Sequence, residues 1–314
     1  MAERSAIVSD GPPAQPIAVE LIAVLVAVAD GQPLAMTIDD GRALPSGPFE
    51  VAHRSLQSGL RAWVERQTRH PLGYVEQLYT FADSDRRNDP AGAHAISISY
   101  LGLVREEGTI APRAAWRPWY DYFPWEDHRG GPPALIKTTI VPELRRWAES
   151  GGDRAARKKR AAIAFGLEGR QWNEELTLQR YEFLYEARLI PEARRPVQDQ
   201  RELALGRPMA GDHRRILATG IARLRAKIKY NPVVFELMPP IFTLLQLQRC
   251  VEAIAGLNLH KPNFRRLIEQ QELVEETGEM VSDTGGRPAK AYRFRAAVRE
   301  ERAAAGTKLP LTRS

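Results

Sequence analysis

Residues 242–295 are the part of the sequence that permits the fewest folds. Thr243 can cap a helix whose apolar residues recur at helical spacing, and Gly256 can end that helix in a left-handed turn. After a short turn, Lys261 and Pro262 suit the first turn of a second helix. The pattern predicts two helices joined by a tight turn.

A β-hairpin is predicted directly after the second helix. Strand-like runs at 275–281 and 291–295 flank a turn with two adjacent glycines and Pro288, and this stiff tip presents Arg287. Helix, turn, helix and hairpin is the order of a winged helix-turn-helix domain, which we place at residues 231–298. Such domains usually bind duplex DNA, although helix pairs with arginines on an exposed face also occur in domains that bind none.

The distribution of charge supports DNA binding at this end of the chain. Residues 211–314 hold 18 Lys and Arg against 11 Asp and Glu, which leaves 27 against 28 of the chain's 45 and 39 for residues 1–210. Release of counterions from phosphates requires such a local basic excess, although a basic end can also serve solubility alone. The predicted DNA contacts are Lys261, Asn263, Arg265 and Arg266 on the second helix and Arg287 and Lys290 on the wing.

Length and cysteine content limit the class of protein. A chain of 314 residues with 43% hydrophobic residues can hold two packed domains. A single cysteine, Cys250, cannot build a disulfide framework or a zinc site, and it suits core packing in a reducing cytoplasm. The apolar run 17–29 is too short to span a bilayer and contains Glu20. We expect no membrane partner, and we expect flexible segments at 1–15 and 299–314.

The N-terminal part predicts a domain of both strands and helices. Residues 19–29 form a continuous apolar run that is typical of a buried central strand, and Asp30-Gly31 turns the chain into a second strand. The remaining predicted elements are strands at 33–38, 75–81 and 95–104 and a helix at 55–69.

The loop before this helix carries the spacing of a known signature. In the Nudix box a glycine is followed by a glutamate and then by Arg-Glu-apolar-any-Glu-Glu-any-Gly-apolar. Counted from Gly47, the positions of Arg61, Trp63 and Glu65 match. The other acidic positions hold His53, Ala62 and Arg66, and the final glycine is replaced by Thr68. The region resembles a Nudix domain whose box has lost most of its carboxylates.

This loss bears on catalysis. Hydrolysis of a diphosphate needs several carboxylates on one helical face to hold Mg²⁺, which neutralises the phosphates and activates water. A lone Glu65 cannot form that cluster, and it can instead pair with Arg61 or Arg69, four positions away on the same face. We therefore predict no catalytic residues, no metal site and no enzyme activity. The alternative is an active Nudix pyrophosphatase that acts on ADP-ribose or NAD-like substrates and carries a DNA-binding module.

Further segments resemble a group of bacterial regulators. Residues 70–104, after the broken box, and residues 212–254, together with the following Asn-Phe-Arg-Arg and Gly-Gly-Arg-Pro-Ala-Lys runs, are similar to Nudix-related transcriptional regulators of NAD metabolism, the NrtR-like group. In that group a Nudix-like domain senses a nucleotide and a C-terminal winged helix binds an operator. The long middle section and the eroded box are similar to its alphaproteobacterial, NadQ-like branch, which represses de novo NAD biosynthesis genes.

The resemblance implies a function. We expect a cytoplasmic, nucleoid-associated repressor of NAD biosynthesis genes that binds double-stranded operator DNA. Its effector would be NAD or a related adenine nucleotide (ADP-ribose, ATP), bound without hydrolysis and acting as co-repressor or as inducer. A homodimer is expected, because a two-fold dimer reads both halves of a palindrome. A rival hypothesis is an adaptor whose winged helix binds a protein.

Residues 105–207 are predicted to extend the sensor domain, 16–207, as an inserted region with helices at 141–149, 153–165 and 173–187. Aromatic residues crowd into 116–125, where they can stack on an adenine or nicotinamide ring or form a hydrophobic cluster or dimer contact. Nearby arginines can face phosphates. The candidate ligand-binding residues are Arg61, Glu65, Arg113, Arg117, Trp119 and Tyr122.

Residues 208–230 are predicted to form a linker helix that joins the domains and pairs with its twin in the dimer, because its apolar residues recur at helical spacing between basic ones. The predicted fold class is therefore α+β. It comprises an N-terminal Nudix-like α/β/α domain with a helical insertion and a C-terminal winged helix-turn-helix.

Overall fold

The computed structural model describes residues 17–82, 95–193, 205–281, 288–295 and 297. The predicted flexible segments at 1–15 and 299–314, and the wing residue Arg287, lie outside the described residues. Among the helices within these ranges, none is long and apolar enough to cross a membrane.

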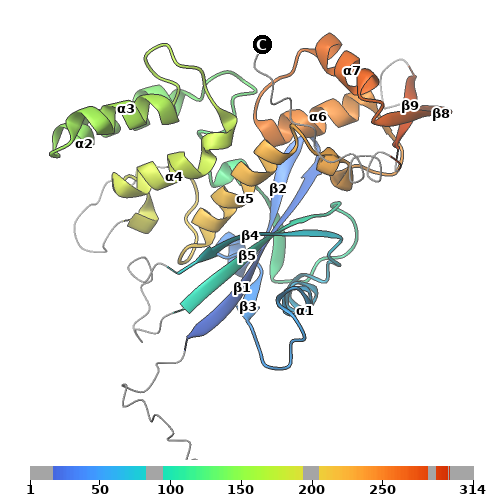
Figure 1. Cartoon of the computed structure of the whole chain (residues 1–314), viewed down its shortest axis with the longest axis horizontal. Coiled ribbons are helices and arrows are strands. Elements are labelled where there is room, and N and C mark those ends of the chain that lie inside the picture. The colour runs from blue at the N-terminus through green and yellow to red at the C-terminus, as the bar shows by residue number, and fades with distance from the viewer. Residues whose placement is uncertain (1–16, 83–94, 194–204, 282–287, 296, 298–314) are drawn as a thin grey trace, which may run out of the picture.

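The N-terminal domain is built on one mixed sheet of six strands (Figure 1). Five of them follow the order β4-β5-β1-β2-β6, and β3 pairs with β1. β1 runs parallel to β5 and antiparallel to β2 and β3. The bounds are β1 Ala18–Ala29, β2 Gln32–Ile38, β3 Ser46–Pro48, β4 Tyr74–Phe81, β5 Ala95–Leu103 and β6 Ala114–Pro118. The predicted strands β1, β2, β4 and β5 are confirmed, whereas β3 and β6 were not predicted.

β1 lies at the centre of the sheet because its residues are apolar on both sides. All residues from Leu21 to Ala27 are buried, and alternate side chains point to opposite faces. On one face Leu21 shares a hydrophobic cluster with Leu60 of helix α1 (Leu56–Thr68). On the other face the neighbouring residues of β1 join the large core with helix α5 (His213–Lys227). The sheet is therefore covered by helices on both sides.

Helix α5 lies within the predicted linker helix, 208–230, but its apolar side is not free to pair with a twin. Its apolar residues Ile216, Ile221 and Leu224 are fully buried within the chain. Gly220 brings the helix close to the sheet, since a Cβ at this position would lie 2.8 Å from a methyl carbon of Val24. An apolar side that is already buried against its own sheet cannot form a seam with a second copy. Helical spacing alone did not reveal what covers that side.

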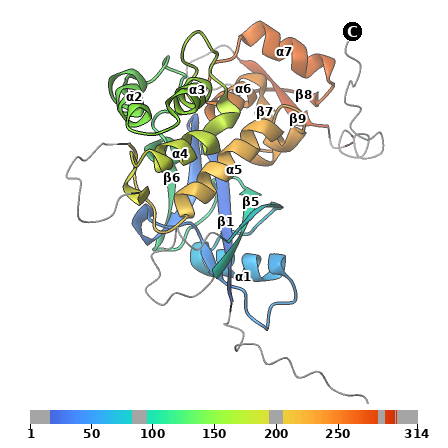
Figure 2. The same ribbon diagram turned by 60° about the vertical axis from the view of Figure 1, so that its left-hand side comes forward.

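The middle section surrounds one end of α5 with further helices. α4 packs on α5, and α2 and α3 lie beside α4 (Figure 2). The bounds are α2 Val141–Glu149, α3 Arg154–Ala164 and α4 Thr177–Glu186, with short helical turns at Asp39–Gly41, Trp119–Asp121, Ile136–Ile140, Glu174–Leu176 and Pro191–Ala193. The predicted helices are thus confirmed. The section is not a simple insertion, however, because β6 lies within it and pairs with β2 as an edge of the sheet.

The C-terminal domain has the predicted winged helix arrangement. Two helices, α6 and α7, pack on a small sheet with the strand order β7-β9-β8. α6 begins at a capping box formed by Thr243 and Gln246 and ends at Gly256, whose φ is 70°. The bounds are β7 Phe242–Thr243, α6 Leu244–Ala255, α7 Lys261–Gln270, β8 Val274–Val281 and β9 Ala289–Phe294, preceded by a 3-10 helix, η7, at Pro232–Leu237.

Candidate functional site

Helix α7 presents a basic face to solvent. Phe264 and Ile268 are buried and hold the helix on the domain core. Lys261, Arg265 and Arg266 are exposed, and none of them has a hydrogen bond or ion pair from its side chain to another described residue. These three cations are therefore available to phosphates or to the edges of bases.

Asn263 is exposed as well, but it has a different setting. It lines a pocket together with Leu267, on the flank of α7 that Arg265 does not share. The four residues predicted to contact DNA from this helix therefore lie around more than one side of it.

The described basic residues of the hairpin that follows α7, and Arg295 next to it, are paired with carboxylates. Lys290 Nζ lies 2.8 Å from Glu276 Oε1 on the neighbouring strand. The guanidinium groups of Arg293 and Arg295 are likewise paired with Glu275 and Glu272. Lys290 is therefore a weaker candidate for DNA contact than the cations of α7, because its charge is offset in the protein.

The C-terminal end of α6 is docked onto the N-terminal domain. Tyr120 Oη donates a hydrogen bond to the carbonyl of Ala253 at 2.7 Å, and Arg225 Nε donates to that of Ile254 at 2.8 Å. The backbone N–H of His128 donates to the carbonyl of Gly256 at 2.8 Å. The last carbonyls of a helix lack partners within it. Here α5 and the segment around Tyr120 and His128 supply them, and this fixes the orientation of the helix-turn-helix.

A buried ionic cluster supports this docking. Glu126 accepts hydrogen bonds from Arg180 and Arg225, and all three side chains are at most 1% exposed. Burial alone would raise the pKa of Glu126, but the two guanidinium groups outweigh this effect and lower it. Arg180 belongs to α4 and Arg225 to α5, so the cluster ties both helices to the aromatic segment that precedes Glu126. Sequence reasoning missed this cluster.

The loop in which the broken Nudix box begins packs closely against helix α1. A Cβ at Gly47 would lie 2.2 Å from ring carbons of Trp63, so only glycine fits beneath that ring. Trp63 Nε1 donates to the carbonyl of Pro48 at 2.9 Å, and the side-chain amide of Gln67 bonds to both backbone groups of Ser46. The surviving residues of the box thus pack β3 against α1.

The polar residues of the box do not form a cluster. Arg61 donates to the carbonyls of Leu72 and Gly73. Among the described residues Glu65 forms an ion pair with neither Arg61 nor Arg69, so the predicted pairing with one of them is wrong. Glu65 is exposed and is the only acidic residue of α1. His53 stands at one lost acidic position and accepts a hydrogen bond from the backbone of Glu50. Over the described ranges, no group of three or more His, Cys, Asp or Glu side chains is placed to hold a metal ion.

Arg113 and Arg117 meet at a polar pocket of about 430 Å³. Arg113 pairs with Asp39 at 3.1 Å, and Arg117 pairs with Asp40 at 3.0 Å. Both aspartates have a positive φ, of 51° and 58°, which non-glycine residues seldom adopt. Tyr122 Oη holds the same loop by donating to the carbonyl of Gly41 at 2.7 Å. The structure thus brings the two arginines together at a strained acidic loop.

The aromatic stacking platform is not formed. Trp119 and Tyr122 are fully buried and belong to the large core cluster, so neither ring offers a face to a ligand. The segment instead forms a hydrophobic cluster, which was the alternative prediction. The six predicted ligand residues therefore occupy three settings. Arg61 and Glu65 lie on α1, Arg113 and Arg117 at the polar pocket, and Trp119 and Tyr122 in the core.

Comparison with known proteins shows what the C-terminal part of the chain is similar to. Residues 234–294 match the family model of the NrtR DNA-binding winged helix domain. Over 93 residues the chain is 44% identical to the ADPR responsive transcriptional repressor NtrR of Acinetobacter baylyi. This match covers 30% of the chain and 37% of the curated relative's length.

Solved structures resemble the chain over most of its length. The crystal structure of Shewanella oneidensis NrtR complexed with a 27mer DNA has a TM-score of 0.53 and 18% identity, and it covers 90% of this chain and 95% of that one. A MutT/nudix family protein from Enterococcus faecalis has a TM-score of 0.52 and 15% identity, with 91% and 90% covered. At such identities the likeness shows the fold alone. Residues 234–294 thus match the NrtR winged helix domain, and the chain as a whole shares the NrtR fold, a Nudix-type domain followed by a winged helix.

Proposed function

We propose that the chain is a transcriptional repressor whose winged helix binds double-stranded operator DNA. The observation that carries the proposal is the match of residues 234–294 to a DNA-binding winged helix domain, together with three cations on the exposed side of α7 that have no partner among the described residues. The curated relative is a transcriptional repressor, and the similar Shewanella structure is a complex with DNA. Genes of NAD biosynthesis are the proposed targets, and the NadQ-like branch stays a prediction from the sequence.

The proposed effector is an NAD-related adenine nucleotide. ADP-ribose is the first candidate, because the curated relative is ADPR responsive, and NAD and ATP are the others. Arg113 and Arg117 are the proposed contacts for its phosphates, since a diphosphate can take over the charges that Asp39 and Asp40 now offset. Arg61 and Glu65 remain proposed contacts on α1.

A continuous part of the structure connects this polar pocket to the DNA-binding domain. β6 carries Arg117 and leads into the buried aromatic segment, where Tyr120 bonds to the end of α6. The segment ends at Glu126, which holds Arg225, and Arg225 in turn bonds to α6. A ligand alters DNA affinity only if it binds two arrangements of the protein differently. We propose that the angle between this segment and α6 distinguishes the two arrangements.

The proposed binding of the nucleotide is non-catalytic. Because α1 offers a single carboxylate, Glu65, it cannot gather the Mg²⁺ ions that diphosphate hydrolysis requires. The fold shared with a MutT/nudix family protein keeps a pyrophosphatase as the second candidate. Incubation with ADP-ribose or NAD and Mg²⁺, followed by chromatography, separates the two. We expect no product, and clear turnover would overturn the non-catalytic proposal.

The protein is proposed to act as a homodimer, because two winged helices related by a two-fold axis can read both halves of a palindromic operator. Sedimentation of the full chain with and without operator DNA tests the stoichiometry. Two chains per duplex are expected, and one chain per duplex at saturation would contradict the proposal.

A mobility-shift assay tests the repressor proposal. The DNA would be the promoter of the protein's own gene and promoters of NAD genes, with and without ADP-ribose or NAD. We expect a shift on at least one promoter that the nucleotide changes. A protein that shifts none of them would favour the adaptor hypothesis instead.

A further inference from the structure

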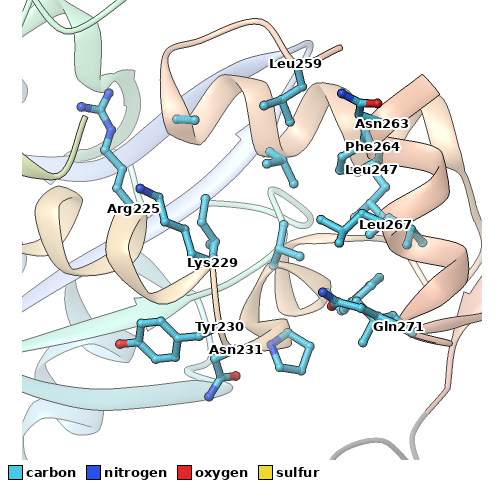
Figure 3. Close-up of a pocket in the computed structure, with 18 of the residues that line it drawn as sticks. Arg225, Lys229, Tyr230, Asn231, Leu247, Leu259, Asn263, Phe264, Leu267 and Gln271 are labelled. Atoms are coloured by element: carbon cyan, nitrogen blue, oxygen red, sulfur yellow. The ribbon is translucent and has the colours of Figure 1, made fainter. Parts of the chain in front are cut away.

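A second pocket lies behind the proposed DNA-binding helix, far along the chain from the polar pocket at Asp39. It has a volume of about 510 Å³, is open to solvent on one side, and is lined by the end of α5, η7, α6 and α7. Figure 3 shows Leu247, Phe264 and Leu267 gathered on one side of it, with Lys229 and Asn231 lying across from them. Ligand pockets of this size, mostly apolar and placed where two domains meet, are typical of sites for small molecules.

Within the described part of the chain α7 packs against α6, and the segment before α6 is the short 3-10 helix η7, which lines the pocket together with α7. Leu267 points into the pocket with 51% of its surface exposed, on a helix whose other apolar residues, Phe264 and Ile268, are buried. An exposed leucine at the wall of a concave apolar pocket gains free energy when an apolar molecule covers it.

The charged residues around the pocket limit which kinds of ligand can bind in it. Lys229 Nζ lies 2.7 Å from a carboxylate oxygen of Glu174 and 2.6 Å from one of Glu175. Arg225, the other cation of the lining, is held by Glu126. Among the described residues that line the pocket, Lys229 is therefore held by two carboxylates and Arg225 is buried with Glu126. Each arginine of the polar pocket, in contrast, pairs with a single, more exposed aspartate, so an anionic ligand is disfavoured here but not there.

The rim still offers neutral hydrogen-bonding groups. The side chains of Asn231, His260 and Asn263 line the pocket, and no hydrogen bond joins any of them to another described residue. The amide groups of Asn231 and Asn263 around an apolar floor can recognise an uncharged ring with a polar edge, because they supply donors and acceptors without charge.

We propose that this pocket is a binding site for a small uncharged aromatic molecule with one or more hydrogen-bonding groups, distinct from the phosphate-binding pocket of the proposed effector. The occupant packs against Leu267 and Phe264 and bonds to the amides of the rim. Since α7 forms one wall, an occupied pocket restrains the helix that carries Arg265 and Arg266. This effect on DNA rests on the proposed repressor function, whereas the binding itself does not.

The test uses the full chain and two matched probes near neutral pH, 2-naphthol, which is uncharged, and 2-naphthoate, which is anionic. Titration calorimetry or saturation-transfer NMR measures their affinities. We expect 2-naphthol to bind at least about tenfold more tightly than 2-naphthoate. Equal affinities, or no binding of 2-naphthol, would overturn the proposal.

Variants locate the site. Leu267→Gln removes apolar surface from the wall at a position that is half exposed, and Ala255→Leu adds side-chain volume to the lining. Both should weaken 2-naphthol binding by about tenfold or more. Met280→Gln is the matched control, since Met280 is 58% exposed in the same domain and does not line the pocket. An equal loss in the control would mean that the probe binds the surface at large, and the proposal would fall.

Two further outcomes separate this proposal from others. If Leu267→Gln changes the sedimentation of the protein while 2-naphthol binding is unchanged, the face is a contact between copies and the proposal is overturned. A protein that binds 2-naphthol in the expected order of probes and variants but shifts no promoter DNA supports the pocket and removes the repressor function. A protein that shifts promoter DNA but does not bind 2-naphthol supports the repressor function and overturns the pocket proposal.

Discussion

Replacement of Gly256 reports directly on how the winged helix is docked to the N-terminal domain. Gly256 ends α6 with a φ of 70°, and a Cβ there would lie 2.4 Å from the carbonyl oxygen of Glu126 and 2.8 Å from Tyr120 Oη. A left-handed conformation costs a non-glycine residue about 1 kcal/mol. Overpacking against backbone that cannot yield adds about 1–3 kcal/mol. We therefore expect Gly256→Ala to lower the free energy of unfolding by about 2–4 kcal/mol.

Gly278 supplies a matched control in the same domain. Its φ is 81°, but no heavy atom of a described residue beyond its chain neighbours lies within 4 Å of the place that a Cβ would take. Gly278→Ala should therefore cost only the conformational term of about 1 kcal/mol. Urea unfolding followed by circular dichroism measures both variants, and the difference should move the midpoint by roughly 1 M. Equal costs for the two variants would refute the docking of α6 against Glu126 and Tyr120.

Further predictions concern the DNA face, pH and thiol reactivity. Arg265→Ala should weaken operator binding by about 1–3 kcal/mol in a mobility-shift titration and weaken binding to random DNA less, if the side chain reads bases. Lys290→Ala should change operator affinity less than Arg265→Ala does, because Glu276 already offsets its charge; a larger loss would show that the wing dominates binding. Burial raises the pKa of Glu76, but hydrogen bonds from Lys227 and other donors outweigh it and lower the pKa to about 2. Since this folded-state pKa lies below the ordinary value of 4.5, the pairing stabilises the protein above about pH 4.5, and the contribution is lost as the pH falls toward 2. Glu76→Gln should therefore flatten the dependence of unfolding free energy on pH in that window, and an unchanged slope would contradict the pairing. Burial also raises the pKa of the Cys250 thiol to about 12, so iodoacetamide should not alkylate the native protein. Mass spectrometry measures the extent of alkylation. Alkylation before unfolding would show that the thiol is accessible.

The sequence predicted best the features that depend on neighbouring residues. The capping residue Thr243, the terminal Gly256 and the spacing between them determine α6 locally, and the structure confirms the helix. The continuous apolar run of β1 predicted a buried central strand, because only a strand covered on both faces tolerates such a run. Cys250 is buried, as predicted for a core residue.

Features that depend on distant residues were not predicted. The apolar side of α5 fits a dimer seam as well as a sheet, and only the fold shows that Val24 and its neighbours cover it. Likewise, the sequence of the aromatic segment does not show whether its rings face a ligand or the core. The ionic cluster joins Glu126 to Arg180, 54 positions away, and to Arg225, 99 positions away. No local spacing rule relates residues so far apart.

If the chain is a DNA-binding regulator that responds to an adenine nucleotide, its affinity for promoter DNA must depend on that nucleotide. Titration of the full chain onto fluorescent promoter DNA, with and without ADP-ribose, measures this dependence, with Arg265→Ala as the comparison. We expect specific binding that ADP-ribose changes and that Arg265→Ala weakens. Binding to promoter and random DNA with the same affinity, unaffected by ADP-ribose, NAD or ATP, would contradict it.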